Sequence, residues 1–147
     1  MTMIREAVHS DLHGLLELYL HLHEDRVPED SAALREAWAQ IMRDPSHHII
    51  VDEEGGQLVA SCVCVIIPNL TRNAQPYGFI ENVVTRAEYR RQGRARACLD
   101  YARDIARRAN CYKLMLMTGS KSAGTLDFYR KCGFNDADKT AFVQWLR

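Results

Sequence analysis

The first third of the chain alternates hydrophobic and polar positions mainly with the period of an α-helix. After a short strand predicted over residues 3–8, Ser10 or Asp11 can cap a helix whose apolar positions lie three or four residues apart. These positions are Leu12, Leu15, Leu16, Tyr19 and Leu22. Ser31 can cap a second helix that runs to about Arg43. Two helices are therefore expected between the first strand and the rest of the sheet.

The middle of the chain changes to the shorter period of β-strands. Strands are predicted over residues 48–52, 57–67 and 77–85. The Glu-Glu-Gly-Gly sequence at 53–56 joins the first two as a turn, and the polar stretch 68–76 is a loop before the third. These three strands are expected to form a meander.

The last third returns to helices and ends in a strand. A helix that opens at Gly93 places small and apolar residues on one face and charged residues on the other. Residues 112–117 are apolar on both faces, which is typical of a buried central strand. A short helix over 123–132 and a final strand over 139–146 follow. The order β-α-α-β-β-β-α-β-α-β predicts an α/β (α+β) fold, a mixed sheet with helices on its faces.

Composition limits the classes of function. The 147 residues amount to about one domain, predicted to span 1–147. The 19 basic residues balance the 19 acidic ones, which disfavours a bulk polyanion binder and predicts no nucleic-acid partner. There is no apolar stretch of about 18 residues, so no membrane span is expected. Five cysteines without a CxxC pair, and an N-terminus unlike a signal peptide, predict free thiols in a reducing cytoplasm.

The stretch from Val83 to Ala95 joins a strand to a helix through a short basic turn. The first amides of a helix lack intrahelical partners, and the helix dipole adds partial positive charge there. Such a turn can hold a pyrophosphate. Gly93 lets the backbone approach the phosphates, and Arg90 and Arg91 add charged donors. The alternative is a solvated basic helix start whose glycine serves only the turn.

Two motifs carry a resemblance to a known family. The segment Arg90–Ala95, RRQGRA, resembles the (R/Q)-x-x-G-x-(G/A) motif of the GCN5-related N-acetyltransferases, or GNAT family. Further along, Leu126–Phe134 resembles the family's second signature, F-Y-x-K-x-G-F. The similarity covers roughly residues 78–134, and Ile80–Thr85 and Cys111–Lys113 are also similar to the glucosamine 6-phosphate N-acetyltransferase branch. The resemblance implies a GNAT fold with a mixed central sheet of six to seven strands flanked by about four helices.

The resemblance also implies acetyl-CoA as the co-substrate. No metal is expected, because the pairs His21–His23 and His47–His48 do not have the spacing of metal ligands. By position, three strand amides would pair with the pantetheine arm, and the motif amides would take the pyrophosphate with Arg90 beside them. The residues so assigned are Val83, Val84 and Thr85 for pantetheine, and Arg91, Gln92, Gly93, Arg94 and Ala95 for the pyrophosphate. Two positions depart from the family. Arg94 stands where an aliphatic residue is frequent and adds a phosphate contact, and Ser122 replaces an Asn that commonly contacts pantetheine.

Acetyl transfer from a thioester needs a neutral amine. Deprotonating an alkylammonium with a pKa of about 10.4 at pH 7 costs roughly 4.6 kcal/mol. A positioned carboxylate can remove that proton, directly or through water, and Glu81 is the best candidate. On a regular strand it shares a face with Phe79 and Val83, and the related branch carries a Glu at the matching position. The alternative is a strand-end Glu that faces solvent or pairs with an arginine.

The departing CoA thiolate needs a partner as well. Tyr129 of the second motif would donate a proton or a hydrogen bond to it, as the family's Tyr commonly does. The alternative is a tyrosine packed beside Phe128 with its hydroxyl satisfied locally. A backbone amide near Val83 or Val84 is the natural donor to the tetrahedral oxyanion.

These residues predict an acyltransferase that moves an acetyl group from acetyl-CoA to a primary amine of a small molecule, by direct attack in a ternary complex. A peptide or protein amine is an alternative acceptor. A sensor or scaffold that binds acetyl-CoA without turnover is an alternative from another class, and a nucleic-acid-binding α/β domain is a third.

The acceptor side and the oligomeric state rest on weaker signals. His21, His23 or Tyr19 are candidates to line the acceptor pocket, and Arg72 in the loop 68–76 is a candidate to reach over it. Following the family's habit, the final strand is expected to pair or pack between two subunits of a homodimer. Its apolar residues include Phe142, Val143 and Trp145.

Overall fold

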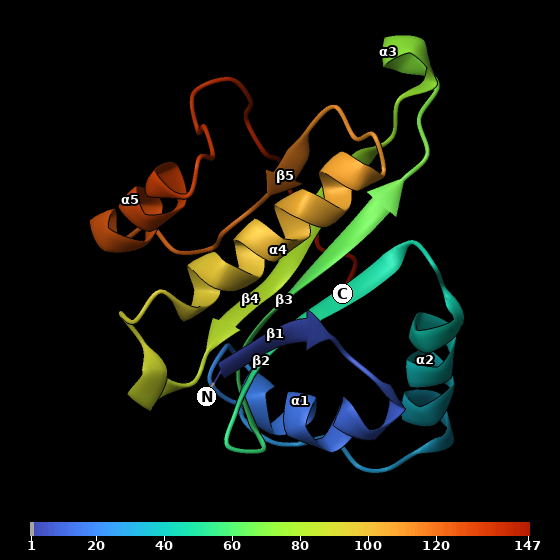
Figure 1. The fold of residues 1–147 in the computed structure, drawn as a ribbon, viewed down its shortest axis with the longest axis vertical. Coiled ribbons are helices and arrows are strands. Elements are labelled where there is room, and N and C mark those ends of the chain that lie inside the picture. The colour runs from blue at the N-terminus through green and yellow to red at the C-terminus, as the bar shows by residue number, and fades with distance from the viewer. Residues whose placement is uncertain (1) are drawn as a thin grey trace.

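The computed structural model describes residues 2–147, which form one five-stranded sheet with helices on both faces (Figure 1). The strands lie in the order β1-β2-β3-β4-β5, and all neighbours are antiparallel except β4 and β5. Their bounds are β1 Thr2–Glu6, β2 His47–Glu54, β3 Gln57–Ile67, β4 Tyr77–Thr85 and β5 Leu114–Leu116. The helices are α1 Leu12–Tyr19, α2 Ala32–Arg43, α3 Thr71–Ala74, α4 Arg94–Arg108 and α5 Ala123–Lys131, with 3-10 turns at His9–Asp11 and Ala87–Tyr89. In the described part of the chain, none of the helices combines the length and apolar character that crossing a membrane requires.

The core is divided by the sheet into two layers. On one face, α4 packs its apolar side against the sheet, with Cys98 and Leu99 among its buried residues. On the other face, α1 and α2 supply Leu18 and Trp38, and β3 supplies Val63. Strand alternation explains the division, because Val63 points to α1 while Cys62 beside it points to α4.

Helix boundaries follow the predicted caps in part. The Ser31 hydroxyl accepts the Leu34 amide at 3.1 Å and begins α2 as expected. Asp11 does not cap α1. Its carboxylate accepts the Val8 amide at 2.7 Å and pairs with Arg5, so it serves the turn before the helix. The order and type of the long helices nevertheless match the sequence pattern.

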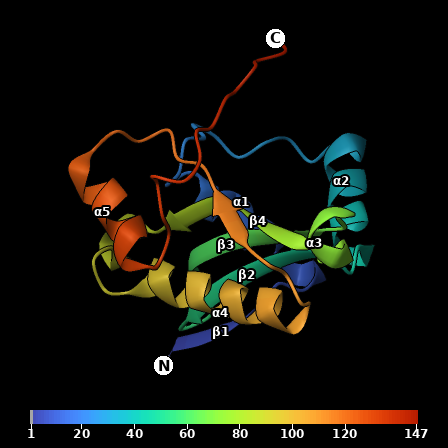
Figure 2. The same ribbon diagram turned by 90° about the horizontal axis from the view of Figure 1, so that it is seen from above.

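The prediction of six to seven strands is wrong, because residues 139–146 form no strand. This segment extends away from the body of the molecule (Figure 2). Phe142, Trp145 and Leu146 are 90%, 74% and 91% exposed, so Trp145 is not a core residue of this chain. A strand needs a neighbour for its backbone groups, and within residues 2–147 this segment pairs with no edge of the sheet.

The strand predicted over 112–117 is also shorter and less central than expected. β5 comprises only Leu114–Leu116, lies at the end of the strand order and is half-buried throughout. Leu114 and Leu116 pack toward the α4-side core. A Cβ atom on Gly78 would lie 2.5 Å from Leu114 Cδ2, so a larger residue at this position, where β5 pairs with β4, would require the Leu114 side chain to move. The apolar character of this stretch reflects contacts with the core on one face and partial cover on the other.

The loop 68–76 contains a short element that the sequence does not predict. α3 has Arg72 and Asn73 at φ 56°, which makes it a left-handed turn and not a regular right-handed helix. The Arg72 guanidinium lies 5.4 Å from the ring centroid of Tyr112. This loop therefore lies at the start of β4, the end remote from the basic turn (Figure 1).

Candidate active site

A β-bulge divides β4 at its centre. Opposite the single residue Cys62 of β3 stand two residues of β4, Asn82 and Val83. Asn82 has φ 51°, a left-handed conformation that Asn adopts more readily than most residues. The bulge leaves one residue of β4 outside the regular ladder, so a backbone group near Val83 is available to a ligand.

The bulge also reverses the alternation of side chains along β4. Glu81 stands opposite Val63, whose side chain belongs to the α1-side core, whereas Val83 packs toward α4. The expectation that Glu81 shares a face with Val83 is therefore wrong. A one-residue insertion moves every later side chain to the other face of the strand.

Beyond the bulge, β4 has no strand beside it on the β5 side. The parallel pairing begins at Gly78 opposite Leu114 and ends at Ile80 opposite Leu116. From there the two strands follow separate courses, β4 toward α4 and β5 toward α5 (Figure 1). The last residues of β4 consequently present an open edge on that side.

The basic turn after β4 has an unusual backbone. Arg91 lies at φ 61° and Gly93 at φ 78°, both in the left-handed region. Gly93 precedes the first residue of α4, and its carbonyl accepts the Ala97 amide at 3.0 Å. The first amides of α4 follow directly on this turn and lack intrahelical partners.

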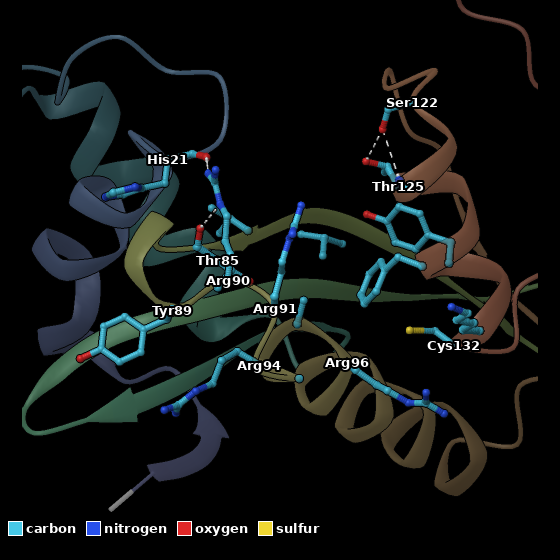
Figure 3. Close-up of a pocket in the computed structure, with 18 residues that line it drawn as sticks. His21, Thr85, Tyr89, Arg90, Arg91, Arg94, Arg96, Ser122, Thr125 and Cys132 are labelled. Atoms are coloured by element: carbon cyan, nitrogen blue, oxygen red, sulfur yellow. Dashed lines mark hydrogen bonds between the residues drawn. The ribbon is translucent and has the colours of Figure 1, made fainter.

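A pocket of about 660 Å³ lies between the end of β4, the turn with the start of α4, and α5 (Figure 3). It brings together almost all of the residues predicted to bind the co-substrate, and Tyr129 with them. Gln92 and Glu81 are not among its lining residues. Segments from three parts of the chain thus converge on one pocket.

The pocket is strongly basic although the chain as a whole has no net charge. None of the described residues that line it is acidic. Five are basic, namely Arg90, Arg91, Arg94, Arg96 and Lys131. An anionic ligand is therefore favoured here over a neutral one.

Arg90 links the turn to the segment that follows α1. Its guanidinium donates to the carbonyl oxygen of His21 at 3.0 Å and to that of Thr85 at 3.3 Å. The Ala87 amide donates to Nδ1 of the same His21 at 3.2 Å. His21, which the sequence offers as a residue of the acceptor pocket, therefore lies at the rim of this pocket and fixes the turn.

α5 forms the opposite wall. The Ser122 hydroxyl accepts the Thr125 amide at 3.2 Å and so caps the helix. The sequence analysis missed Thr125, Phe128 and Cys132, which line the pocket together with Tyr129. Their spacing of three and four residues places them on one helix face, and that spacing is the signal that identifies them.

Tyr129 is half-buried between two aromatic rings. The ring centroids of Phe128 and Phe134 lie 5.1 Å and 6.3 Å from its own. Burial, with smaller contributions from the thiols of Cys132 and Cys62, raises the pKa of Tyr129 above its usual value. The phenol therefore stays protonated and able to donate at neutral pH.

The cysteines are thiols without activation. Burial raises the pKa of Cys64 and of Cys98 to about 12, and it also raises the pKa of the pocket residue Cys132. A thiol held protonated is a poor nucleophile. Within residues 2–147, no three His, Cys, Asp or Glu side chains gather in a way that could hold a metal ion.

Comparison of the sequence with known proteins identifies relatives over most of the chain. The model of the Acetyltransferase (GNAT) family matches residues 12–134. A glucosamine 6-phosphate N-acetyltransferase of Trypanosoma brucei brucei is 33% identical over 133 residues, which cover 89% of this chain and 87% of that protein.

Solved structures that resemble this chain also include acetyltransferases. One similar structure is that of a protein from Agrobacterium tumefaciens str. C58 that is provisionally named an acetyltransferase. It matches with a TM-score of 0.89 and 39% identity, over 97% of this chain and 99% of that one. Glucosamine-6-phosphate N-acetyltransferase from Arabidopsis thaliana matches with a TM-score of 0.85 and 24% identity, over 100% and 99% of the two chains, a likeness of fold.

The fold and the sequence comparisons together show that the protein is an acyltransferase of the acetyltransferase class. The chain is a member of the GNAT family, and the resemblance on Arg90–Ala95 and Leu126–Phe134 is confirmed.

Proposed function

We propose that this protein transfers an acetyl group from acetyl-CoA to a primary amine of a small molecule, by direct attack in a ternary complex. The observation that carries the proposal is the pocket, which joins a basic turn at a helix N-terminus to an open strand edge and a buried tyrosine. Residues 1–147 would constitute one such N-acetyltransferase domain.

The parts of acetyl-CoA suit the three segments that form the pocket, namely the end of β4, the turn with the start of α4, and α5. Its diphosphate suits the amides from Arg91 to Ala95 and the positive charge around them. Its pantetheine arm carries amides that can pair with the open edge of β4 at Val83, Val84 and Thr85, in the manner of an added strand. Ser122, at the start of α5, is placed to contact the same arm.

The reacting groups lie around the bulge. The amine attacks the thioester carbonyl, and a β4 amide near Val83 or Val84 stabilises the oxyanion. Tyr129 lies on the α5 wall and would donate a hydrogen bond to the departing thiolate from there. Glu81 is exposed on the α1 side of β4, just before the bulge, and would receive the amine's proton there, directly or through water.

An amino sugar phosphate is the favoured acceptor. The support is the Trypanosoma brucei brucei relative, a glucosamine 6-phosphate N-acetyltransferase that is 33% identical. In this proposal the acceptor approaches from the side of α1, where His21 lies at the rim of the pocket. Arg72 is not among the residues that line the pocket and stacks on Tyr112 instead, so it carries no role in this proposal.

The decisive experiment has two steps. Calorimetry with the purified protein is expected to give saturable binding of coenzyme A, and the absence of heat would overturn the proposal. A thiol-release assay with acetyl-CoA and a panel of amines then separates an enzyme from a sensor or scaffold. Glucosamine 6-phosphate, polyamines and a lysine peptide form the panel, and thiol release with none of them at saturating acetyl-CoA would favour the binding module.

A homodimer is part of the proposal. Phe142, Val143, Trp145 and Leu146 are all exposed, and a second copy would cover them. Sedimentation velocity is expected to show a dimer for the full chain, and Trp145→Glu with Phe142→Glu is expected to shift it to monomer. A monomer at micromolar concentration for the unchanged chain would contradict this.

The Gly93→Ala variant tests the phosphate turn. An L-residue at φ 78° costs about 1–2 kcal/mol, and the turn relieves this strain by moving its amides. We expect the affinity for coenzyme A to fall about tenfold, which is the same free energy expressed as a ratio. Gly56→Ala is the matched control, since Gly56 has φ 79°, an equally open surrounding, and lies in the β2–β3 turn. Equal losses of affinity in the two variants would refute a specific role for Gly93.

A further inference from the structure

The side chain of Arg94 turns away from the pocket that its backbone helps to form. Figure 3 shows it directed toward β1 and β2, whereas Arg91 stands over the pocket. Arg94 Nη2 lies 2.5 Å from a carboxylate oxygen of Glu54, and Nη1 lies 3.2 Å from one of Asp52. Nη1 also donates to the Thr2 hydroxyl at 2.9 Å. The first residue of α4 is thereby tied to the end of β2.

These contacts are sheltered from solvent. The Arg94 side chain is 14% exposed and that of Asp52 is 1% exposed. Tyr89, from the 3-10 turn before the motif, places its ring 5.2 Å below the guanidinium. The interaction with the Glu54 carboxylate raises the pKa of Tyr89, which is consistent with this carboxylate lying near Tyr89 as well as near Arg94. We refer to Arg94, Asp52, Glu54 and Tyr89 as the Arg94 clasp.

The turn between Tyr89 and Arg94 has a strained backbone that contacts with the rest of the molecule can stabilise. Arg91 and Gly93 both have left-handed backbones, and a non-glycine residue persists there only when the surroundings fix it. Arg94 follows Gly93 directly, and Tyr89 lies two residues before Arg91. The clasp therefore attaches the strained segment to the sheet on both sides.

Electrostatics argues against a direct role for the Arg94 charge. Two carboxylates face one guanidinium, so the group as a whole has no excess positive charge to offer a phosphate. Asp52 and Glu54 would by themselves repel a phosphate bound at the turn. Their position is explained if they fix the side chain of Arg94.

We infer that Arg94 is a positioning residue, which acts through the clasp to hold the amides of residues 91–95 ready for the diphosphate of the co-substrate. This inference rests on the proposed function, because it concerns how that function's ligand is bound. It replaces the expectation that the Arg94 side chain itself contacts phosphate.

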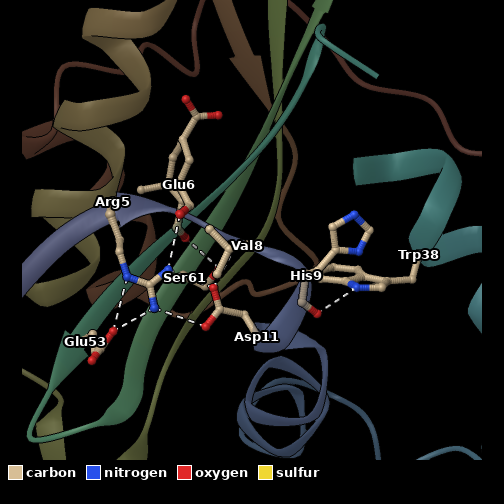
Figure 4. Close-up of polar contacts among 9 residues, drawn as sticks. Arg5, Glu6, Val8, His9, Asp11, Trp38, Glu53 and Ser61 are labelled. Carbon is tan, nitrogen blue, oxygen red and sulfur yellow. Dashed lines mark hydrogen bonds and ion pairs between the residues drawn. The ribbon is translucent and has the colours of Figure 1, made fainter. Parts of the chain in front are cut away.

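Neighbouring residues of β2 supply a matched test. Glu53 and Glu54 are both 30% exposed, and each pairs with an arginine, at 2.6 Å and 2.5 Å respectively. The partner of Glu53 is Arg5, which also binds Asp11 and lies away from the turn (Figure 4). Glu54→Gln loosens the clasp, whereas Glu53→Gln removes an equivalent pair with no link to the pocket. Neither change leaves a fully buried charge without a partner.

Coenzyme A binding is the first measurement, by calorimetry at fixed ionic strength. Glu54→Gln is expected to weaken it about fivefold, less than the full effect of a charge-assisted hydrogen bond because Glu54 is partly exposed and the pair with Asp52 remains, and Glu53→Gln to leave it unchanged. The KM for acetyl-CoA rises in parallel while kcat at saturation stays the same. If only the net charge near the phosphates mattered, Glu54→Gln would bind coenzyme A more tightly, because removing a carboxylate favours an anionic ligand. Unchanged or tighter binding by Glu54→Gln, or equal weakening by Glu53→Gln, overturns the inference.

Hydrogen exchange of the unliganded protein is the second measurement and does not need the ligand. Amides of residues 89–96 are expected to exchange faster in Glu54→Gln than in Glu53→Gln, with the rest of the chain unchanged. Equal exchange in the two variants contradicts the clasp. If the unchanged protein fails to bind coenzyme A, the proposed function fails, and the exchange result still decides whether the clasp holds the turn.

Discussion

Tyr129→Phe is expected to lower kcat about 10- to 100-fold with little change in the KM for acetyl-CoA, because a hydrogen bond to a charged group contributes about 1.5–3 kcal/mol. The missing hydroxyl would otherwise stabilise the departing thiolate. The ring remains, and with it the packing against Phe128 and Phe134. The loss is therefore confined to the reacting state and not to binding.

The direction of the pKa shift defines how this tyrosine acts. A free thiol has a pKa of about 8.5 and a phenol one of about 10, so full transfer of the phenolic proton costs about 2 kcal/mol before any shift. Burial raises the pKa of Tyr129 further and makes that transfer less favourable. Tyr129 is therefore expected to donate a hydrogen bond and keep its proton. Because the pKa of Tyr129 is raised above its usual value, the wild-type rate is not expected to fall through this group in assays up to pH 9.

Tyr101→Phe is the control for Tyr129→Phe. Tyr101 lies on α4, is half-buried and packs against the same core, but it does not line the pocket. Steady-state assays of both variants with saturating acetyl-CoA, and thermal unfolding to verify their stability, complete the comparison. A wild-type turnover number for Tyr129→Phe would remove the tyrosine from the mechanism.

The parts of the site that the sequence predicts are those made by neighbours along the chain. The turn Arg90–Ala95 lies between a strand end and a helix start, and local pattern suffices to place its amides. The α5 wall is similar, because one helix face carries Tyr129 with Cys132 three residues on. The order of strand end, turn and helix start can therefore be predicted from the local sequence, although the exact backbone of the turn also depends on distant contacts.

The parts that the sequence does not predict depend on pairing between distant segments. The bulge at Asn82 exists only relative to β3, since it is a mismatch in count against Cys62. The Arg94 clasp joins residues 40 and 42 positions apart. Residues 139–146 contain apolar and aromatic residues that are frequent in strands, but within the described chain they pair with no edge of the sheet. The sequence pattern alone therefore predicted one strand too many at this end of the chain.

Glu81→Gln is expected to lower the rate of amine acetylation about 100-fold at pH 7, the lower end of what a general base contributes. Without the carboxylate, the reaction depends on amine that is already neutral in solution. That fraction rises tenfold per pH unit until the pKa of the amine is reached, so the deficit of the variant shrinks as pH rises. The measurement is the ratio of wild-type to variant kcat/KM for the amine between pH 6 and 9.

The bulge gives this test its significance, since Glu81 lies on the α1 face just before it, whereas Val83 just after it faces α4. A base there removes the proton on the acceptor side of β4, away from the thiolate. Glu88→Gln is the control, because Glu88 is an exposed glutamate near the turn that lines no part of the pocket. A ratio for Glu81→Gln that stays flat from pH 6 to 9 would mean that solvent takes the proton, and that the amine reaches the thioester already neutral.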